Sequence, residues 1–167
     1  RNGSTSQGAS TLTQQLIKNN VFEAGGETNI IAKVKRKIQE QYLAIIAEKK
    51  YNKEDILTNY LNTINLGKGN LGVEAASKYY FGKSVNELTL SECAVLAGIT
   101  KNPTFLNPVD YPEDNDARRK LILKKMYQLN YISDTEYQSA LEDKVYARIA
   151  NKTAQGRKNS VYSYFTD

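Results

Sequence analysis

Apolar residues recur every three or four positions along most of this 167-residue chain, which is the spacing of amphipathic helices. The strongest repeat runs over residues 29–50. Further helices are predicted at 10–20, 53–64, 71–80, 90–99 and 113–130, and a last one begins after Ser133. The 29–50 helix carries an apolar stripe formed by Ile31, Val34, Ile38, Tyr42 and Ile45. Because Tyr42, Tyr60 and Tyr79 lie on such stripes, we expect these three side chains in the core.

Helix starts are marked by side chains that can accept hydrogen bonds from the first turn. Ser10 or Thr11 can cap the first helix and Asn52 the third. Ser or Thr followed three residues later by Glu is a capping box, and it occurs at 89–92 and 133–136. The 90–99 helix is apolar on nearly all sides, which predicts a buried helix. With no convincing strand, the sequence predicts a mainly α fold, an irregular helical globule.

The composition, 40% apolar and 25% charged, is that of a soluble globular protein. The longest apolar run is far short of the roughly 20 residues that span a bilayer. Cys93 is the single cysteine, which excludes an internal disulfide, and its apolar setting predicts a small buried residue. The absence of histidine excludes a Ser-His triad and any histidine base or metal ligand. A net charge of +5 and a pI near 9.1 favour an anionic partner.

The same patterns divide the chain into three parts. Residues 1–9 are rich in Gly, Ser and Asn and are predicted to be a mobile loop at a truncated start. Residues 10–148 are predicted to form one domain. Residues 149–167 are rich in Lys, Gly, Asn and Ser and are predicted to be a linker and a stub of a following domain.

Two segments carry candidate chemistry. On the 29–50 helix, a second face holds Arg36, Glu40, Ala44, Ala47 and Glu48 at steps of three and four. Small residues beside a carboxylate leave room for a ligand, but a solvated face with an Arg–Glu pair has the same pattern. The second segment, residues 8–19, crowds hydroxyls, amides and a lysine at the start of a short helix, where anions are favoured. A capped surface helix is the alternative there.

These segments resemble the peptidoglycan glycosyltransferases, glycosyltransferase family 51, which are domains of class A penicillin-binding proteins and of monofunctional transglycosylases. GASTLTQQLIKN at 8–19 is similar to the family motif G-x-S-T-x-T-Q-Q-L-x-K-N. Residues 36–48 match R-K-x-x-E-x-x-x-A-x-x-x-E, and Lys53 with ILTNYLN at 56–62 resembles a third block. Blocks at 72–76, 80–83 and 90–98 follow in the family's order. The resemblance covers about residues 7–145 and implies a lysozyme-like helical fold.

The resemblance also implies a reaction. The 4-hydroxyl of one lipid II attacks C1 of a lipid-linked glycan with inversion, and undecaprenyl diphosphate leaves. The family's general-base glutamate lies in an E-D-x-x-F-x-x-H motif upstream of Gly8, which this histidine-free sequence lacks, so the fragment is expected to be inactive alone. The second family glutamate corresponds to Glu40, expected near the leaving diphosphate, where it holds a divalent cation such as Mg or Mn or orients basic groups. No organic cofactor is expected. The substrate-binding residues implied are Ser10, Thr11, Gln15, Lys18, Asn19, Arg36 and Lys37.

The same resemblance implies the ligands and the cellular location of the protein. Lipid II and the growing glycan strand are the expected ligands, at the outer face of a bacterial plasma membrane reached through an anchor outside this chain. A transpeptidase domain is expected after residue 167. One rival is a lytic muramidase of the same fold, which would shorten glycan strands instead of extending them. The other is a basic helical nucleic-acid-binding domain, which no recognition-helix pattern supports, so no nucleic acid partner is expected.

Overall fold

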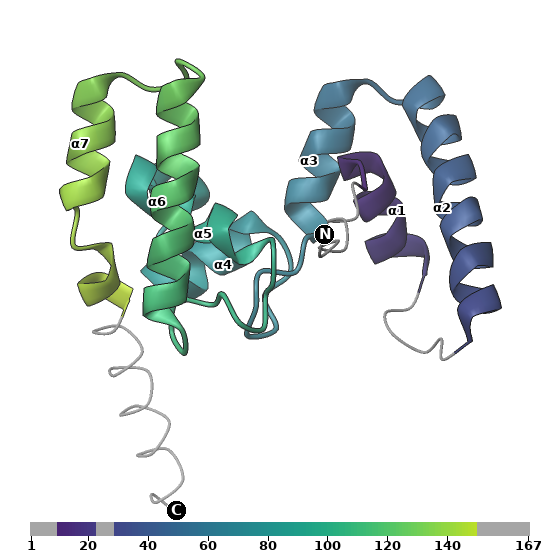
Figure 1. The fold of residues 1–167 in the computed structure, drawn as a ribbon, viewed down its shortest axis with the longest axis horizontal. Helices are drawn as coiled ribbons and strands as arrows, with labels where there is room; N and C mark the ends of the chain where they lie inside the picture. The colour runs from purple at the N-terminus through teal and green to yellow at the C-terminus, as the bar shows by residue number, and fades with distance from the viewer. Residues whose placement is uncertain (1–9, 23–28, 150–167) are drawn as a thin grey trace, which may run out of the picture. The chain divides into compact units, whose positions relative to one another are not determined.

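The computed structural model describes residues 10–22 and 29–149 (Figure 1). The secondary structure of these residues is helical except for an isolated antiparallel bridge between Asn65 and Leu71. The predicted mainly α class is therefore confirmed. The elements are α1 (Leu12–Val21), α2 (Ile30–Lys50), α3 (Lys53–Thr63), α4 (Val73–Phe81), a 3₁₀ turn η1 (Val85–Glu87), α5 (Leu90–Ile99), α6 (Pro112–Gln128) and α7 (Asp134–Glu142).

The predicted helix caps are confirmed, with Thr11 the cap of α1 of the two candidates Ser10 and Thr11. Thr11 caps α1 and forms a capping box with Gln14, and Asn52 caps α3 by accepting from the backbone N–H of Asp55. The capping boxes at 89–92 and 133–136 open α5 and α7. Each cap depends on residues three apart in the chain, so the local sequence determines it. The 3₁₀ turn, with its own box between Ser84 and Glu87, was not predicted.

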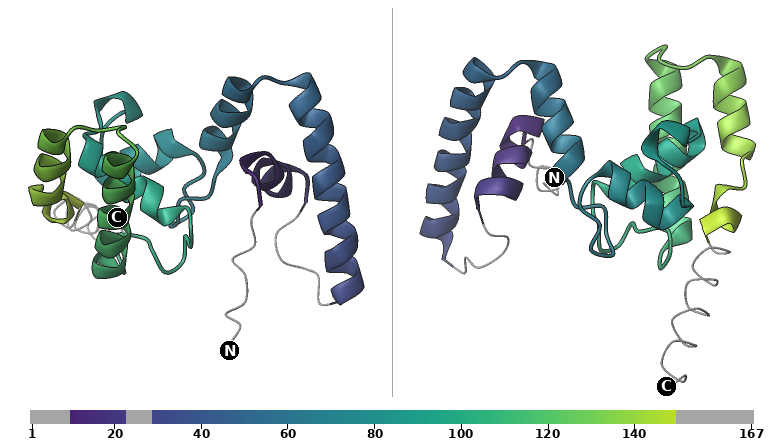
Figure 2. Two further views of the ribbon diagram at one scale, coloured as in Figure 1. Left: turned by 45° about the horizontal axis from the view of Figure 1, so that its top comes forward. Right: turned by 180° about the vertical axis from the view of Figure 1, so that it is seen from behind.

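The contacts divide the chain into two compact units, one up to Ile64 and one from Asn65 onwards. In unit 1, α1 contacts both α2 and α3, which Figures 1 and 2 show on either side of it. The core of this unit uses one face of α3, with Ile56, Tyr60 and Ile64 buried. The prediction for Tyr60 is therefore confirmed.

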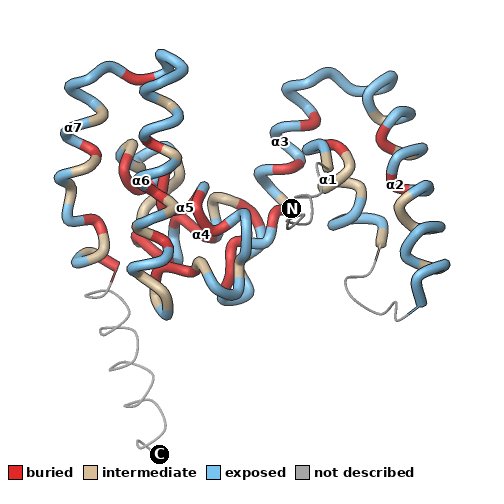
Figure 3. The backbone as a smooth tube through the Cα atoms, in the orientation of Figure 1, coloured by how far each residue is buried: buried red, intermediate tan, exposed pale blue. Residues whose placement is uncertain are grey.

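Helix α2 packs through the face opposite to its apolar stripe. Glu40 and Ala44 are its buried residues, whereas Ile38 is 61% exposed and Tyr42 65% exposed. Figure 3 shows the exposed surface running along most of the helix. The expectation that Tyr42 lies in the core is wrong for this unit, because the small residue Ala44 lets α1 approach the other face. The remaining stripe residues Ile31, Val34 and Ile45 are exposed as well.

In unit 2, α5 contacts α4, α6 and α7, and α6 and α7 form an antiparallel pair (Figure 1). Its core includes Ala94, Leu123, Ile132 and Ala140. Most of α5 is buried, as predicted, but Cys93 is exposed, so that expectation is wrong. Periodicity cannot identify which single position of an apolar helix faces outward.

On α4 one of two neighbouring tyrosines differs from the prediction. Tyr79 is 44% exposed, so its expected core position is wrong, and Tyr80 is buried instead. The hydroxyl of Tyr80 donates to the backbone oxygen of Leu66 at 2.8 Å, which satisfies its polar end. The two rings meet edge to face, with centroids 5.0 Å apart.

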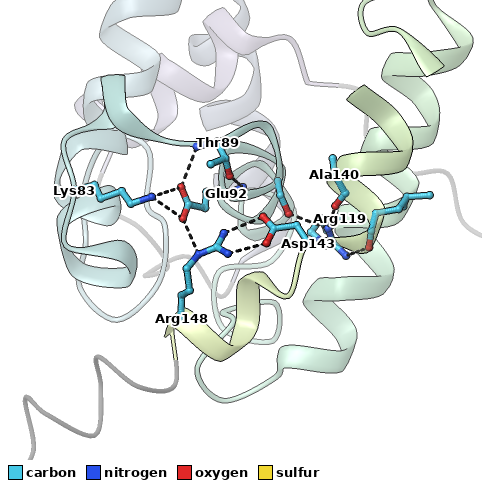
Figure 4. A network of polar contacts seen from close by, with 9 residues as sticks. Lys83, Thr89, Glu92, Arg119, Ala140, Asp143 and Arg148 are labelled. Atoms are coloured by element: carbon cyan, nitrogen blue, oxygen red, sulfur yellow. Dashed lines mark hydrogen bonds and ion pairs between the residues drawn. The ribbon is translucent and has the colours of Figure 1, made fainter. Parts of the chain in front are cut away.

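A buried polar network joins the elements of unit 2 (Figure 4). Glu92 is fully buried and accepts from Lys83, Arg148 and the backbone N–H of Thr89, at 2.9–3.1 Å. Arg148 also holds Asp143 through two bonds of 2.7 and 2.9 Å. These bonds fix a last helical turn at 145–149 against α5, with Val145 and Ile149 buried. The predictions for residues 1–9 and 150–167 lie outside the described residues.

Candidate functional site

A buried carboxylate between two cations is the centre of the candidate site in unit 1. Glu40 is 1% exposed. Its Oε1 accepts from Arg36 Nη1, and its Oε2 lies 2.9 Å from Lys37 Nζ. Lys37 Nζ also donates to Ser10 Oγ at 2.7 Å, which links α2 to the residue preceding the N-cap of α1. A cation, a hydroxyl and a carboxylate thus meet where the two sequence segments with candidate chemistry approach each other.

The helical repeat explains how α2 presents this group. Residues three and four positions apart lie on one face, so Arg36 and Lys37, four and three positions before Glu40, can both contact its carboxylate. Ala44 continues the face as a buried small residue. Removing a carboxylate from water costs several kcal/mol unless cations and hydrogen bonds compensate. Here each oxygen of Glu40 has its own cationic partner, so the buried charge is satisfied.

Helix α1 brings a second polar layer to the same place. Gln15 Nε2 donates to the backbone oxygen of Ser10 at 3.3 Å, and its Oε1 accepts from the hydroxyl of Tyr60 at 3.3 Å. Burial raises the pKa of Tyr60 above its ordinary value, which keeps the hydroxyl protonated as a donor. Tyr60 was predicted only as a core residue. Its polar role depends on a partner 45 positions away, which no local pattern reveals.

Three predicted site residues do not join this group. The side chain of Thr11 accepts from the backbone N–H of Gln14 and serves as the cap of α1. Lys18 and Asn19 are exposed, and neither side chain makes a hydrogen bond or ion pair with the described residues. Their assigned roles remain predictions, since exposed polar groups at one end of a helix are also what a solvated surface provides.

The chemistry available at the site is that of anion binding. The Lys37 side chain is 44% exposed although its ammonium contacts both Ser10 and Glu40. An ammonium has three N–H donors, and two of them are used here, so one remains for a ligand oxygen. Arg36 is 23% exposed beside it. Two cations fixed by one buried acid leave a net positive charge that suits a phosphate or diphosphate.

The same geometry does not suit a divalent metal at Glu40. Both oxygens already face a cation, and a metal ion would have to displace Arg36 and Lys37 against their charge repulsion. Within residues 10–22 and 29–149, no group of three His, Cys, Asp or Glu side chains could hold a metal ion.

Residues 1–127 match the transglycosylase family. The chain belongs to this family. Penicillin-binding protein 1A of Haemophilus influenzae is 47% identical over 146 residues, which are 87% of this chain and 16% of that protein. Penicillin-binding protein 1A of Clostridium botulinum strain Langeland is 42% identical over 166 residues, or 96% of this chain and 19% of that protein. This transglycosylase chain thus spans less than a quarter of the length of either relative.

A solved structure agrees with the family assignment. The 2.6 Å crystal structure of penicillin-binding protein 1A from Haemophilus influenzae aligns with a TM-score of 0.54 at 47% sequence identity. The alignment covers 56% of the transglycosylase chain and 14% of that chain. Helix α7 begins after residue 127, where the family match ends. It still packs against α5 and α6, and buried Arg119 of α6 donates to its backbone.

Proposed function

We propose that this transglycosylase chain takes part in peptidoglycan synthesis by polymerising lipid II into glycan strands. The acceptor 4-hydroxyl would attack C1 of the lipid-linked donor with inversion, and the diphosphate lipid would leave. The single observation that supports this best is the Glu40 carboxylate buried between Arg36 and Lys37, because a fixed pair of cations suits a leaving diphosphate. Family membership and 42–47% identity to penicillin-binding proteins 1A support the same reaction.

In this proposal Glu40 acts through its neighbours. At 1% exposure the carboxylate is shielded from a ligand, whereas Lys37 is accessible. Glu40 would therefore hold the ammonium and guanidinium in position and limit their repulsion. Ser10 and Gln15 would complete the surface with a hydroxyl and an amide, and Thr11, Lys18 and Asn19 would bind sugar or phosphate oxygens along α1.

The reaction also needs a general base that residues 1–167 do not supply by the family pattern. No E-D-x-x-F-x-x-H segment occurs in the sequence. We therefore expect this chain alone to bind a diphosphate lipid weakly and not to form glycan strands. The wider setting stays part of the proposal: lipid II and a glycan strand as ligands, the outer face of the plasma membrane, and a transpeptidase domain elsewhere in the polypeptide. Among the helices that the structure describes, none is long and apolar enough to cross a membrane.

A chimaera provides the sharpest test. The part of this chain that aligns over 146 residues with the Haemophilus influenzae penicillin-binding protein 1A replaces its counterpart there, and the product is incubated with lipid II. Glycan strands should grow, and Glu40→Gln should abolish growth while the circular dichroism spectrum is retained. Lys33→Met serves as the control, since Lys33 is exposed on the same helix. Control turnover should stay near that of the unmodified chimaera.

Other outcomes separate the alternatives. Near-normal polymerisation by the Glu40→Gln chimaera would refute the role of Glu40. Release of fragments from finished glycan by the unmodified chimaera, without growth from lipid II, would favour the lytic muramidase. A second assay titrates the 167-residue chain with a phosphoglycolipid of the moenomycin type, where Lys18→Ala should weaken binding. Unchanged affinity would count against a phosphate role for Lys18.

A further inference from the structure

A cavity in unit 2 lies apart from the residues used in the proposed function. Its volume is about 570 Å³, which lies within the size range of small-ligand pockets. The loop after α5 lines it with Lys101, Phe105 and Leu106. Helix α6 lines it with Asp114, Arg118 and Leu121, which share one helix face at steps of four and three.

Buried amide side chains fix the loop wall of this cavity. Asn115 is fully buried, and its Nδ2 donates to the backbone oxygens of Leu106 at 2.7 Å and Val95 at 3.2 Å. Asn107 is 3% exposed and donates to the backbone oxygen of Thr104 at 3.0 Å. These bonds give the irregular 101–111 stretch one conformation, so a ligand would meet a preformed wall.

Arg118 supplies the cationic part of the cavity. Its stem lies against Gly98 of α5, where an added Cβ would stand 3.4 Å from Arg118 Cγ. Its Nε is buried and has no hydrogen-bond partner among the described residues. A buried unsatisfied donor costs about 1–3 kcal/mol. A turn of the guanidinium toward an acceptor in the cavity would recover that free energy. Lys101 adds a second cation, against the single acid Asp114.

Exposed apolar side chains supply the apolar part of the cavity. Phe105 is 57% exposed and Leu121 is 45% exposed, although both line the cavity. The ring of Phe105 is braced by Tyr111, with centroids 5.7 Å apart. We propose that this cavity binds an amphiphilic anion, a carboxylate or phosphate group on an apolar stem. The anion lies on Arg118 and Lys101, and the stem covers Phe105 and Leu121.

The test is a titration of the 167-residue chain with octanoate, followed by the NMR amide signals of residues 101–121. Octanoate should bind saturably and about ten-fold more tightly than octanol, which lacks the charge, or acetate, which lacks the stem. Octyl phosphate is compared with octanoate to distinguish a phosphate ligand from a carboxylate ligand. Equal affinity for octanol, equal affinity for acetate, or no saturable shift would each overturn the proposal.

Matched variants assign the binding to the named residues. Arg118→Met keeps an unbranched stem without the charge and should weaken octanoate binding about ten-fold. Lys124→Met, at an exposed position of the same helix, should leave the affinity unchanged. If Arg118→Met unfolds, Lys101→Met and Phe105→Ala replace it, because both positions are exposed. Octanoate binding that survives both of these substitutions would refute the assignment.

Discussion

Glu40 shows how a single residue can be read in two ways from a sequence. On a helix wheel it belongs to a polar face, which would ordinarily be solvated. In unit 1 it is buried together with Ala44 of the same face, because Arg36 and Lys37 neutralise it and Ser10 bonds Lys37. The stability of this group depends on each of its members, because removing one leaves a polar partner without a hydrogen bond at a site shielded from water.

Replacing Lys37 by Met should expose that dependence. The substitution leaves Ser10 Oγ and Glu40 Oε2 without their shared donor, so the free energy of unfolding should fall by about 1–3 kcal/mol. Urea unfolding of the 167-residue chain, followed by far-ultraviolet circular dichroism, measures the change. Lys33→Met is the matched control and should change the free energy by less than about 0.5 kcal/mol. Equal effects of the two variants would contradict the buried pairing.

Unit 2 also contains a buried charged residue with several partners, Arg119, which is 2% exposed. It donates to Ser91, to Asp116 and to backbone oxygens at the end of α7, including that of Ala140. Arg119→Met would remove the donor to Ser91 and to the α7 backbone, leave Asp116 with Lys120 alone, and should destabilise unit 2 by about 3–5 kcal/mol. Lys120→Met removes only a surface bridge to Asp116 and should cost at most about 1 kcal/mol. Amide exchange rates of α7 report the loss, and unchanged rates in Arg119→Met would refute this role.

At the scale of elements, helix starts were predictable and helix orientation was not. Asn52, Thr89 and Ser133 were identified as caps, and Thr11 as one of two candidates, because each contact is made within three residues. The face of α2 that is buried depends on its contact with α1, and the sequence pattern of α2 alone does not contain that information. The periodicity of α2 contains two faces, one apolar and one of small and charged residues. Unit 1 buries the second.

This inversion on α2 can be measured. Ala44 is 4% exposed, so Ala44→Leu would overpack the α1–α2 contact and should cost about 1–3 kcal/mol of unfolding free energy. Ile38→Ala truncates an exposed residue and should change it by less than about 0.5 kcal/mol. Both values come from urea unfolding of the same 167-residue chain. A larger cost for Ile38→Ala than for Ala44→Leu would show that the apolar stripe is the buried face.

For the whole molecule, the sequence predicted one domain over 10–148, and the contacts group into two units that meet between Ile64 and Asn65 in the chain. Each of the two proposed sites is formed by residues of a single unit. The Glu40 group lies in unit 1, and the Arg118 cavity lies in unit 2. Pairings such as Ser10 with Lys37, or Glu92 with Arg148, are 27 and 56 residues apart. Residue types at these positions were visible in the sequence, but long-range pairing is decided by the packing of helices.

The pH dependence of unit 2 follows from its acidic groups. Burial by itself would raise the pKa of Glu92, but the Thr89 amide, Lys83 and Arg148 outweigh it and hold the pKa below the ordinary 4.5. The bonds from Arg148 likewise lower the pKa of Asp143 below 3.8. A carboxyl whose pKa is lower when folded stabilises the fold above its unfolded pKa, and this stability is lost as the pH falls through the folded pKa.

Unit 2 should therefore be most stable above about pH 4.5 and should lose stability as the pH falls below that value. Urea unfolding at a series of pH values between neutrality and acid, followed by NMR signals of α5, gives the slope. Glu92→Gln removes one titrating group, so it should lower stability at neutral pH and flatten the acid slope, by up to about 1.4 kcal/mol per pH unit. Glu142→Gln, at an exposed position of α7, is the control and should keep the slope. If Glu92→Gln and the unmodified chain lose stability in parallel, the buried network does not control the acid response, and unfolding begins elsewhere in the unit.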